Sequence, residues 1–482
     1  MKLKLLFLIA VFLFFCNCIF SQTDTNSQEE KSDDDSRTER EERLETLKFG
    51  IEGDIVSLID KLIKEKDAEY AKEILPIFQK THNVKVREKS LEYFIAIEDP
   101  ALKDYAITIL EDPYDEKKST VSMAFRYVSE LKIEEAVPAV VELIKSDNED
   151  YYDNCITTLG KIGGPDEAKY LAELLDSEDI STGRKQSLMR ALGEMKAIET
   201  YDKLVEIASD TEENTFVRCY AAQAIGDMQV EGAIDVLSEI FEETDNNLRT
   251  YVIKGLSNFN TEKSNSIILD GLKDSYYKIR IEAAKVAKKQ NIVEAVPYLI
   301  YRSKNDPENS VKYECYSALA SIKADDGIDY LISVVKDKKL SETARAKAVT
   351  YLLENNIEKA YEPIFTVART ALKDDKLKNL RYSIGKDLAK YENPLFESIC
   401  ADYLAHKDIP TSGTGLDIFA KNKFSGLTDT VKKMAQDKKE NANRRKARQI
   451  LNRMGVSWSE ETDANDESES KAKTAPMSVD AK

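Results

Sequence analysis

The sequence predicts an all-α fold, a solenoid of about a dozen stacked helical hairpins, and three observations lead to this prediction. Glycine and proline, which interrupt helices, account for only 17 and 11 of the 482 residues. Hydrophobic residues (42%) and charged residues (33%) are balanced as in amphipathic helices with a solvated outer face. A pattern of basic, small and apolar residues also recurs every 31 to 33 positions, so the chain can grow without one central core.

At the N-terminus, residues 1–21 have the three-part form of a secretory signal peptide. Lys2 and Lys4 precede an apolar run, Leu5 to Phe15, and a more polar stretch ends at Ser21. We therefore expect export, to the periplasm or the cell envelope. Two alternatives remain open: a retained membrane anchor, although the apolar run is short, and a lipoprotein with lipid on Cys18, although the residues before it match that signal poorly.

Acidic, polar segments with few apolar residues flank the repeats, at residues 22–45 and 456–482. Segments of this composition cannot bury enough apolar surface to fold, so we expect both to be disordered. The net charge of −18 and the pI near 4.9 also argue against nucleic acid as a partner, because most of the surface would repel a polyanion.

Between these ends, a basic position repeats at a fixed period, and we call it the basic ladder: Lys185, Arg218, Arg249, Arg280, Lys312 and Arg345. Small or apolar residues follow each rung after three, four, six and seven positions, which is the spacing of one helix face. A leucine or isoleucine lies nineteen positions after each rung, and another lies at the same position one repeat upstream of the ladder. These residues predict a second helix: Leu171, Leu204, Leu237, Ile268, Leu299, Leu331 and Ile364. Such hairpins bury their apolar faces only against their neighbours.

The turn inside the hairpin has its own signals. Pro138 and Pro297 end two copies of the motif Glu-Ala-Val-Pro, and proline suits the first turn of the second helix because its missing N–H costs nothing there. The Gly163-Gly164 pair predicts a tight turn between two helices. A phosphate-binding loop is the alternative for residues 160–164, but the segment lacks the required spacing and follows a helix.

The unit resembles the short HEAT-like repeat of phycobilisome lyases, and the residues that carry the resemblance best are Val217-Arg218, Ala221-Ala222, Ile225-Gly226 and Leu237. The resemblance implies a HEAT-like α-solenoid, which we place at residues 46–455. The pattern is clearest over 121–367 and degraded over 378–430. A lyase activity is a further implication, but a lyase that attaches tetrapyrroles works in the cytosol, which conflicts with the expected export.

No catalytic, cofactor-binding or metal site is predicted. His82 and His406 are the two histidines, and both stand at weakly patterned positions where a solvated imidazole is expected. The cysteines after the signal segment are far apart in sequence and fall within helical apolar patterns, so we expect small buried side chains: Cys155, Cys219, Cys315 and Cys400. The tyrosine pairs, such as Tyr313 and Tyr316, are expected mainly in the core.

Three polar features suggest binding, each with a plainer interpretation. The basic ladder either lines a surface for carboxylates or phosphates or stacks neighbouring repeats. The segment 410–415, Pro-Thr-Ser-Gly-Thr-Gly, is expected to be an inserted loop or hinge. A C-terminal basic cluster either contacts an anionic membrane surface or caps the array, and it comprises Lys432, Lys433, Lys438, Lys439, Arg444, Arg445, Lys446, Arg448 and Arg453.

These observations favour a non-catalytic scaffold, outside the cytoplasm, that binds a protein on the curved surface of the solenoid. A long surface of shallow contacts suits a protein partner better than a small-molecule substrate. No small-molecule substrate is evident from the sequence. Two other functions are kept as alternatives: a lyase-type enzyme, and a lipid-anchored structural protein of the envelope. The binding residues are not predicted.

Overall fold

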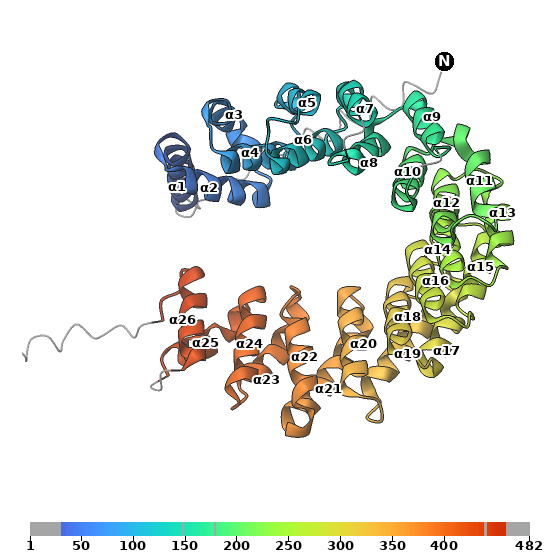
Figure 1. Cartoon of the computed structure of the whole chain (residues 1–482). Coiled ribbons are helices and arrows are strands. Elements are labelled where there is room, and N and C mark those ends of the chain that lie inside the picture. The colour runs from blue at the N-terminus through green and yellow to red at the C-terminus, as the bar shows by residue number, and fades with distance from the viewer. Residues whose placement is uncertain (1–29, 147–148, 178–179, 438–440, 459–482) are drawn as a thin grey trace, which may run out of the picture. The chain divides into compact units, whose positions relative to one another are not determined.

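Helical hairpins make up the described part of the chain, which comprises residues 30–146, 149–177, 180–437 and 441–458 of a computed structural model (Figure 1). These residues form 26 α-helices and short 3-10 turns, with no strand among them, so the predicted all-α class is confirmed. The chain divides into two compact units after Ile180, and each is described by itself.

Unit 1 begins with helix α1 (Glu30–Phe49) and continues with four hairpins. Its first helices are α2 (Glu52–Glu65), α4 (Val84–Ala96), α6 (Lys118–Glu130) and α8 (Tyr152–Ile162). Its second helices are α3 (Ala71–Lys80), α5 (Lys103–Glu111), α7 (Val137–Lys145) and α9 (Pro165–Leu174). Pro138 lies in the first turn of α7, and Gly163-Gly164 separates α8 from α9, as predicted.

Unit 2 contains eight hairpins and the final helix α26 (Ala442–Arg453). Its first helices are α10 (Thr182–Met195), α12 (Thr215–Met228), α14 (Asn246–Leu256), α16 (Tyr277–Gln290), α18 (Asn309–Ile322), α20 (Glu342–Glu354), α22 (Lys378–Leu388) and α24 (Ile409–Asn422). Its second helices are α11 (Tyr201–Ser209), α13 (Ala233–Phe241), α15 (Glu262–Gly271), α17 (Val296–Asn305), α19 (Asp325–Lys336), α21 (Tyr361–Lys373), α23 (Glu397–Leu404) and α25 (Thr428–Ala435). With unit 1 they make the dozen hairpins that the sequence predicts.

The core follows the predicted periodicity. The leucine or isoleucine nineteen positions after each of the six rungs, and the leucine one repeat upstream, are 0% exposed: Leu171, Leu204, Leu237, Ile268, Leu299, Leu331 and Ile364. Burial of one such side chain contributes about 1.5–3 kcal/mol relative to exposure. Many first helices end at a residue in the left-handed conformation, as Lys66, Gln229 and Asn291 do, and the chain then turns into the second helix.

First helices pack against first helices, and second against second, in two rows within unit 2. The first-helix row lies on the inner side of the curve that this unit follows (Figure 1). Its helices approach closely where small residues meet. At Gly226 in α12, an added Cβ would lie 2.5 Å from the carbonyl carbon and oxygen of Gly255 in α14. The Ile-Gly step of the repeat therefore serves backbone contact between neighbouring repeats.

The expectation of disorder over residues 22–45 is wrong from Glu30 onward, where α1 begins; residues 22–29 lie outside the described residues. Charged side chains attach this helix to unit 1. Arg43 pairs with Glu65 at 2.9 Å and Asp67 at 3.2 Å, Arg40 pairs with Glu69, and Leu47 is buried. Opposite charges thus supply contacts that a search for apolar residues does not detect.

Two expectations about the C-terminal region also need correction. The segment 410–415 is no loop, since it forms the start of α24. Hairpins continue through residues 378–430, within the predicted solenoid, although the sequence pattern is degraded there. Disorder from residue 456 is wrong for the first three residues: the Trp458 indole N–H donates to Asn452 at 2.8 Å, and the ring stacks on Arg448 at 4.1 Å. Residues 1–21 and 459–482 lie outside the described residues, so their predictions stay predictions.

Candidate functional site

The basic ladder is engaged within the fold at five of its six rungs. Arg280 shows the fullest arrangement: its Nε and Nη2 donate to the two carboxylate oxygens of Asp306 at 2.7 and 2.8 Å. Its Nη1 donates to the carbonyls of Asp274 and Ser275, at 2.9 and 2.8 Å. Both side chains are buried, with exposures of 5% for Arg280 and 0% for Asp306.

Three other rungs repeat this pairing with an acid 25 to 28 positions later, at the end of the same hairpin: Lys185 with Glu213 at 2.7 Å, Arg218 with Glu243 at 2.6 Å, and Arg249 with Asp274 at 2.6 Å. Arg345 donates instead to the carbonyl of Val335 at 2.9 Å. The acid pairs therefore join the two ends of one hairpin, while the carbonyl contacts of Arg280 and Arg345 reach the preceding hairpin, as expected for residues that stack repeats. Sequence analysis missed a further rung, Arg381, which pairs with Asp375 at 3.0 Å and lies 36 positions after Arg345, outside the strict period.

A second feature lies on the first-helix row of unit 2, and we call it the Tyr220 cluster: Arg190, Tyr220, Tyr251 and Lys254, from α10, α12 and α14. The Tyr220 and Tyr251 rings have centroids 5.1 Å apart. The Arg190 guanidinium lies over the Tyr220 ring at 5.4 Å, and the Lys254 ammonium over the Tyr251 ring at 4.0 Å. Sequence analysis missed this cluster, although Tyr220 and Tyr251 are one period apart and repeat at the same helix position.

The electrostatics of the Tyr220 cluster follow from these contacts. A hydrogen bond with Tyr251 lowers the pKa of Tyr220, and burial raises the pKa of Tyr251. The neighbouring Asp227 accepts a hydrogen bond from Asn258 at 2.8 Å, and burial raises its pKa. Half-buried aromatic rings beside cations are the side chains that most often anchor protein partners.

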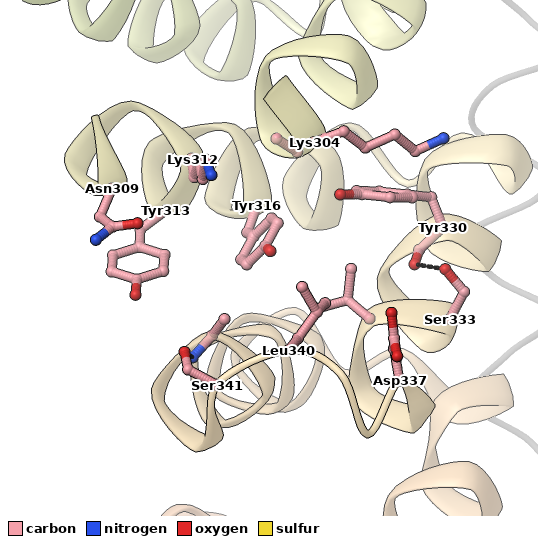
Figure 2. Close-up of a pocket in the computed structure, with 13 residues that line it drawn as sticks. Lys304, Asn309, Lys312, Tyr313, Tyr316, Tyr330, Ser333, Asp337, Leu340 and Ser341 are labelled. Atoms are coloured by element: carbon pink, nitrogen blue, oxygen red, sulfur yellow. Dashed lines mark hydrogen bonds between the residues drawn. The ribbon is translucent and has the colours of Figure 1, made fainter. Parts of the chain in front are cut away.

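A third feature is a pocket of about 380 Å³ at the loop edge of unit 2, where α17, α18, α19 and the start of α20 meet; we call it the Tyr316 pocket. Figure 2 shows Tyr316 and Tyr330 on two of its sides, with Leu340 directed into the space between them. The ring centroids of Tyr316 and Tyr330 are 6.4 Å apart. The Lys304 ammonium lies 5.0 Å from the centroid of Tyr330.

Besides Lys304, the charged groups of the Tyr316 pocket are Lys312, the one rung that lacks a partner, and Asp337. Lys312 lines the pocket, and among the described residues no hydrogen bond or ion pair engages its ammonium. Asp337 lines it from another side, and its carboxylate accepts the backbone N–H of Lys339 at 2.8 Å. Burial raises the pKa of Tyr316 and Tyr330, so both phenols stay protonated. Tyr316 is in the core as predicted, yet it also lines this pocket.

The histidines and cysteines take structural positions. His406 differs from the expected solvated imidazole: its Nδ1 accepts the backbone N–H of Asp408 at 3.1 Å, and its Nε2 lies 3.0 Å from the carbonyl of Leu372. His82 is exposed. Burial raises the pKa of the four thiols to about 12, and all four are free, at Cys155, Cys219, Cys315 and Cys400. Within the described ranges, no group of three or more His, Cys, Asp or Glu side chains could hold a metal ion.

The C-terminal basic cluster is partly used in packing. Lys446 donates to the carbonyl of Gly413 at 2.8 Å and pairs with Asp417 at 2.7 Å, and Arg448 donates to the carbonyl of Ala435 at 2.9 Å. Lys438 and Lys439 lie outside the described residues. These contacts fit a capping hairpin, and membrane contact stays a prediction. No helix in the described segments is both long enough and apolar enough to cross a bilayer.

Comparisons with known proteins give one family match. The family described as "Spirochaete HEAT repeat protein" matches residues 47–450. No curated protein matches the chain. Similar solved structures include the CpcE–CpcF complex of phycocyanin lyase from Nostoc sp. PCC7120, with 15% identity, 54% of this chain and 92% of that chain covered, and a TM-score of 0.31.

Human deoxyhypusine hydroxylase is 16% identical, with 52% of this chain and 96% of that chain covered and a TM-score of 0.25. A Kap95:Nup1 complex is 14% identical, with 86% of this chain and 58% of that chain covered and a TM-score of 0.42. The chain thus spans little more than half of that last structure.

Proposed function

We propose, since the chain belongs to the Spirochaete HEAT repeat protein family, that it is a non-catalytic scaffold that binds a protein partner outside the cytoplasm. The family match confirms the HEAT-like resemblance that the sequence predicts. The partner and the location are our proposal, because fold alone does not fix function.

The Tyr220 cluster is the observation that carries the proposal. It joins three successive first helices of unit 2, so its side chains present one surface that a single repeat could not form. Tyr220 and Tyr251 are half-buried, and Arg190 is exposed. Rigid aromatic rings lose little conformational entropy on binding, and residues of this kind dominate the energies of protein interfaces.

The test is capture of partners by the tagged full-length chain in its native cells, with quantitative mass spectrometry of the captured proteins. We expect the double substitution Tyr220→Ser and Tyr251→Ser to lower capture of the main partner about tenfold or more. The control is Tyr301→Ser, which changes a tyrosine of α17 that is 58% exposed on the second-helix row.

A third variant separates the scaffold surface from the C-terminal basic cluster. It replaces Lys433, Arg445 and Arg453, which are exposed, with glutamine. If capture falls only in this variant and is unchanged by the tyrosine substitutions, the proposed surface is wrong.

The proposed location rests on residues 1–21 alone, and mass spectrometry of the natural N-terminus tests it. A chain that begins near Gln22 supports export in soluble form. A diacylated Cys18 supports a lipid-anchored protein of the envelope. An intact Met1 contradicts these two forms and is the result expected for a retained membrane anchor.

A further inference from the structure

At four of its six rungs, the basic position of the ladder binds a carboxylate. At Lys185, Arg218, Arg249 and Arg280 the cation meets a carboxylate of its own hairpin at 2.6 to 2.7 Å. Four rungs of different composition therefore place a carboxylate in the same local setting. The contacts of Lys312 can therefore be compared with those of the equivalent residues in these four repeats.

The equivalent acid is present at Lys312, but it does not close the rung. Asp337 follows Lys312 by 25 positions, as Glu243 follows Arg218. It caps the C-terminus of α19, as Asp306 caps α17. Nevertheless, no ion pair within 4.0 Å joins Lys312 to Asp337 in the described structure.

The open rung has the shortest pair of side chains. The closed rungs combine arginine with glutamate, arginine with aspartate, or lysine with glutamate. Lysine with aspartate is the shortest of the four combinations, and it occurs at the rung that stays open. The space left over belongs to the Tyr316 pocket of about 380 Å³, within the size range of small-ligand sites.

We propose that the Tyr316 pocket binds a carboxylate attached to an aromatic or apolar group, with the Lys312 ammonium as its ion-pair partner. The ligand carboxylate takes the place that an internal carboxylate fills at the closed rungs. Lys304 adds a second positive charge at the pocket, and the Tyr316 and Tyr330 hydroxyls are hydrogen-bond donors.

The rest of the pocket selects the body of the ligand. The Tyr316 and Tyr330 rings and Leu340 offer apolar contact, and Figure 2 shows all three around the same space. Asp337 repels an anion on its own side of the pocket. The carboxylate of the ligand must therefore point toward Lys312, and the aromatic or apolar group of the ligand must point away from Lys312. The pocket is separate from the Tyr220 cluster, and its occupancy does not depend on the proposed function.

The probe is N-acetyl-tyrosine, and the matched control ligand is its uncharged amide. Titration calorimetry with the full chain should show the acid binding about tenfold or more tightly than the amide, the difference expected for a charge-assisted hydrogen bond. A blocked glutamate, N-acetyl-glutamate amide, distinguishes a side-chain carboxylate from a terminal one. Equal binding of acid and amide would overturn the proposal.

Three variants locate the site. Lys312→Met removes the ammonium and should abolish the preference for the acid. Asp337→Glu restores the lysine–glutamate combination of Lys185 and Glu213, so it should close the rung, abolish binding and raise the melting temperature. The matched control is Lys336→Met, an exposed lysine of α19, which should bind like the native chain. Unchanged binding in both Lys312→Met and Asp337→Glu would refute the site even if the acid binds.

Discussion

At Gly226, the close approach of α12 and α14 leaves no room for a side chain. We expect Gly226→Ala to destabilise the protein by about 1–3 kcal/mol, because the added methyl meets the backbone of Gly255 and α14 must shift. The control is Gly183→Ala in α10, where an added Cβ has nothing within 4 Å, so helix propensity should make that change neutral or stabilising. Denaturant unfolding measures both. Equal effects of the two substitutions would contradict this role of Gly226.

The buried pair of Arg280 and Asp306 gives a second prediction for single residues. Arg280→Met removes the two-point partner of Asp306, which is 0% exposed and then keeps Arg302 at 3.8 Å and the backbone N–H of Glu308 at 3.0 Å, and it should cost about 3–5 kcal/mol of unfolding free energy. The double variant Arg280→Met and Asp306→Leu should recover much of this loss, because the buried carboxylate is removed together with its main partner. A double-mutant cycle in denaturant unfolding measures the coupling. Additive effects would mean that the pair is not a unit.

Acid should weaken unit 2 through Asp408. Hydrogen bonds from the hydroxyls of Thr411 and Tyr382 lower its pKa to about 2, below the value of about 3.9 in an unfolded chain. Since the folded pKa is the lower one, this group contributes stability above about pH 4, and the contribution is lost as pH falls toward 2. Asp408→Asn should flatten the fall in unfolding free energy over this window. An unchanged pH profile in the variant would contradict the assignment.

Among the elements, α24 shows where sequence analysis failed and why. Its start reads as a loop because it is rich in glycine, serine and threonine. In the fold these small residues serve packing, since a Cβ at Gly415 would lie 2.6 Å from the backbone nitrogen of Leu404. The signals of a helix start were present: Asp408 caps the first turn by accepting the Thr411 N–H, and Pro410 lies within that turn. The loop prediction followed the glycine, serine and threonine content and gave these helix-start signals too little weight.

The hairpins over residues 121–367 were predictable because one apolar face repeats at a constant period. The candidate sites were less so. The sequence places Lys312 in the ladder and Tyr316 in the core, and both positions hold. Whether Lys312 reaches Asp337 depends on a separation between α18 and the end of α19, which periodicity does not give. Periodicity likewise does not predict that Tyr330 lines the pocket from α19, because that too depends on the separation between helices.

At the scale of the whole molecule, stability should be local, because each hairpin contacts only its neighbours. Leu237→Ala, at a fully buried position of α13, should cost about 2–5 kcal/mol. Hydrogen exchange followed by mass spectrometry should show faster exchange in α12 to α15 and unchanged exchange in α4 to α7 of unit 1. Uniformly faster exchange along the chain would instead indicate a single cooperative body.

The four buried thiols carry a practical consequence of this locality. Each belongs to a different hairpin: Cys155 in α8, Cys219 in α12, Cys315 in α18 and Cys400 in α23. At neutral pH a thiol with a pKa of about 12 reacts with a disulfide reagent only when its surroundings open. The order in which the four thiols are labelled therefore reports the order in which their hairpins open.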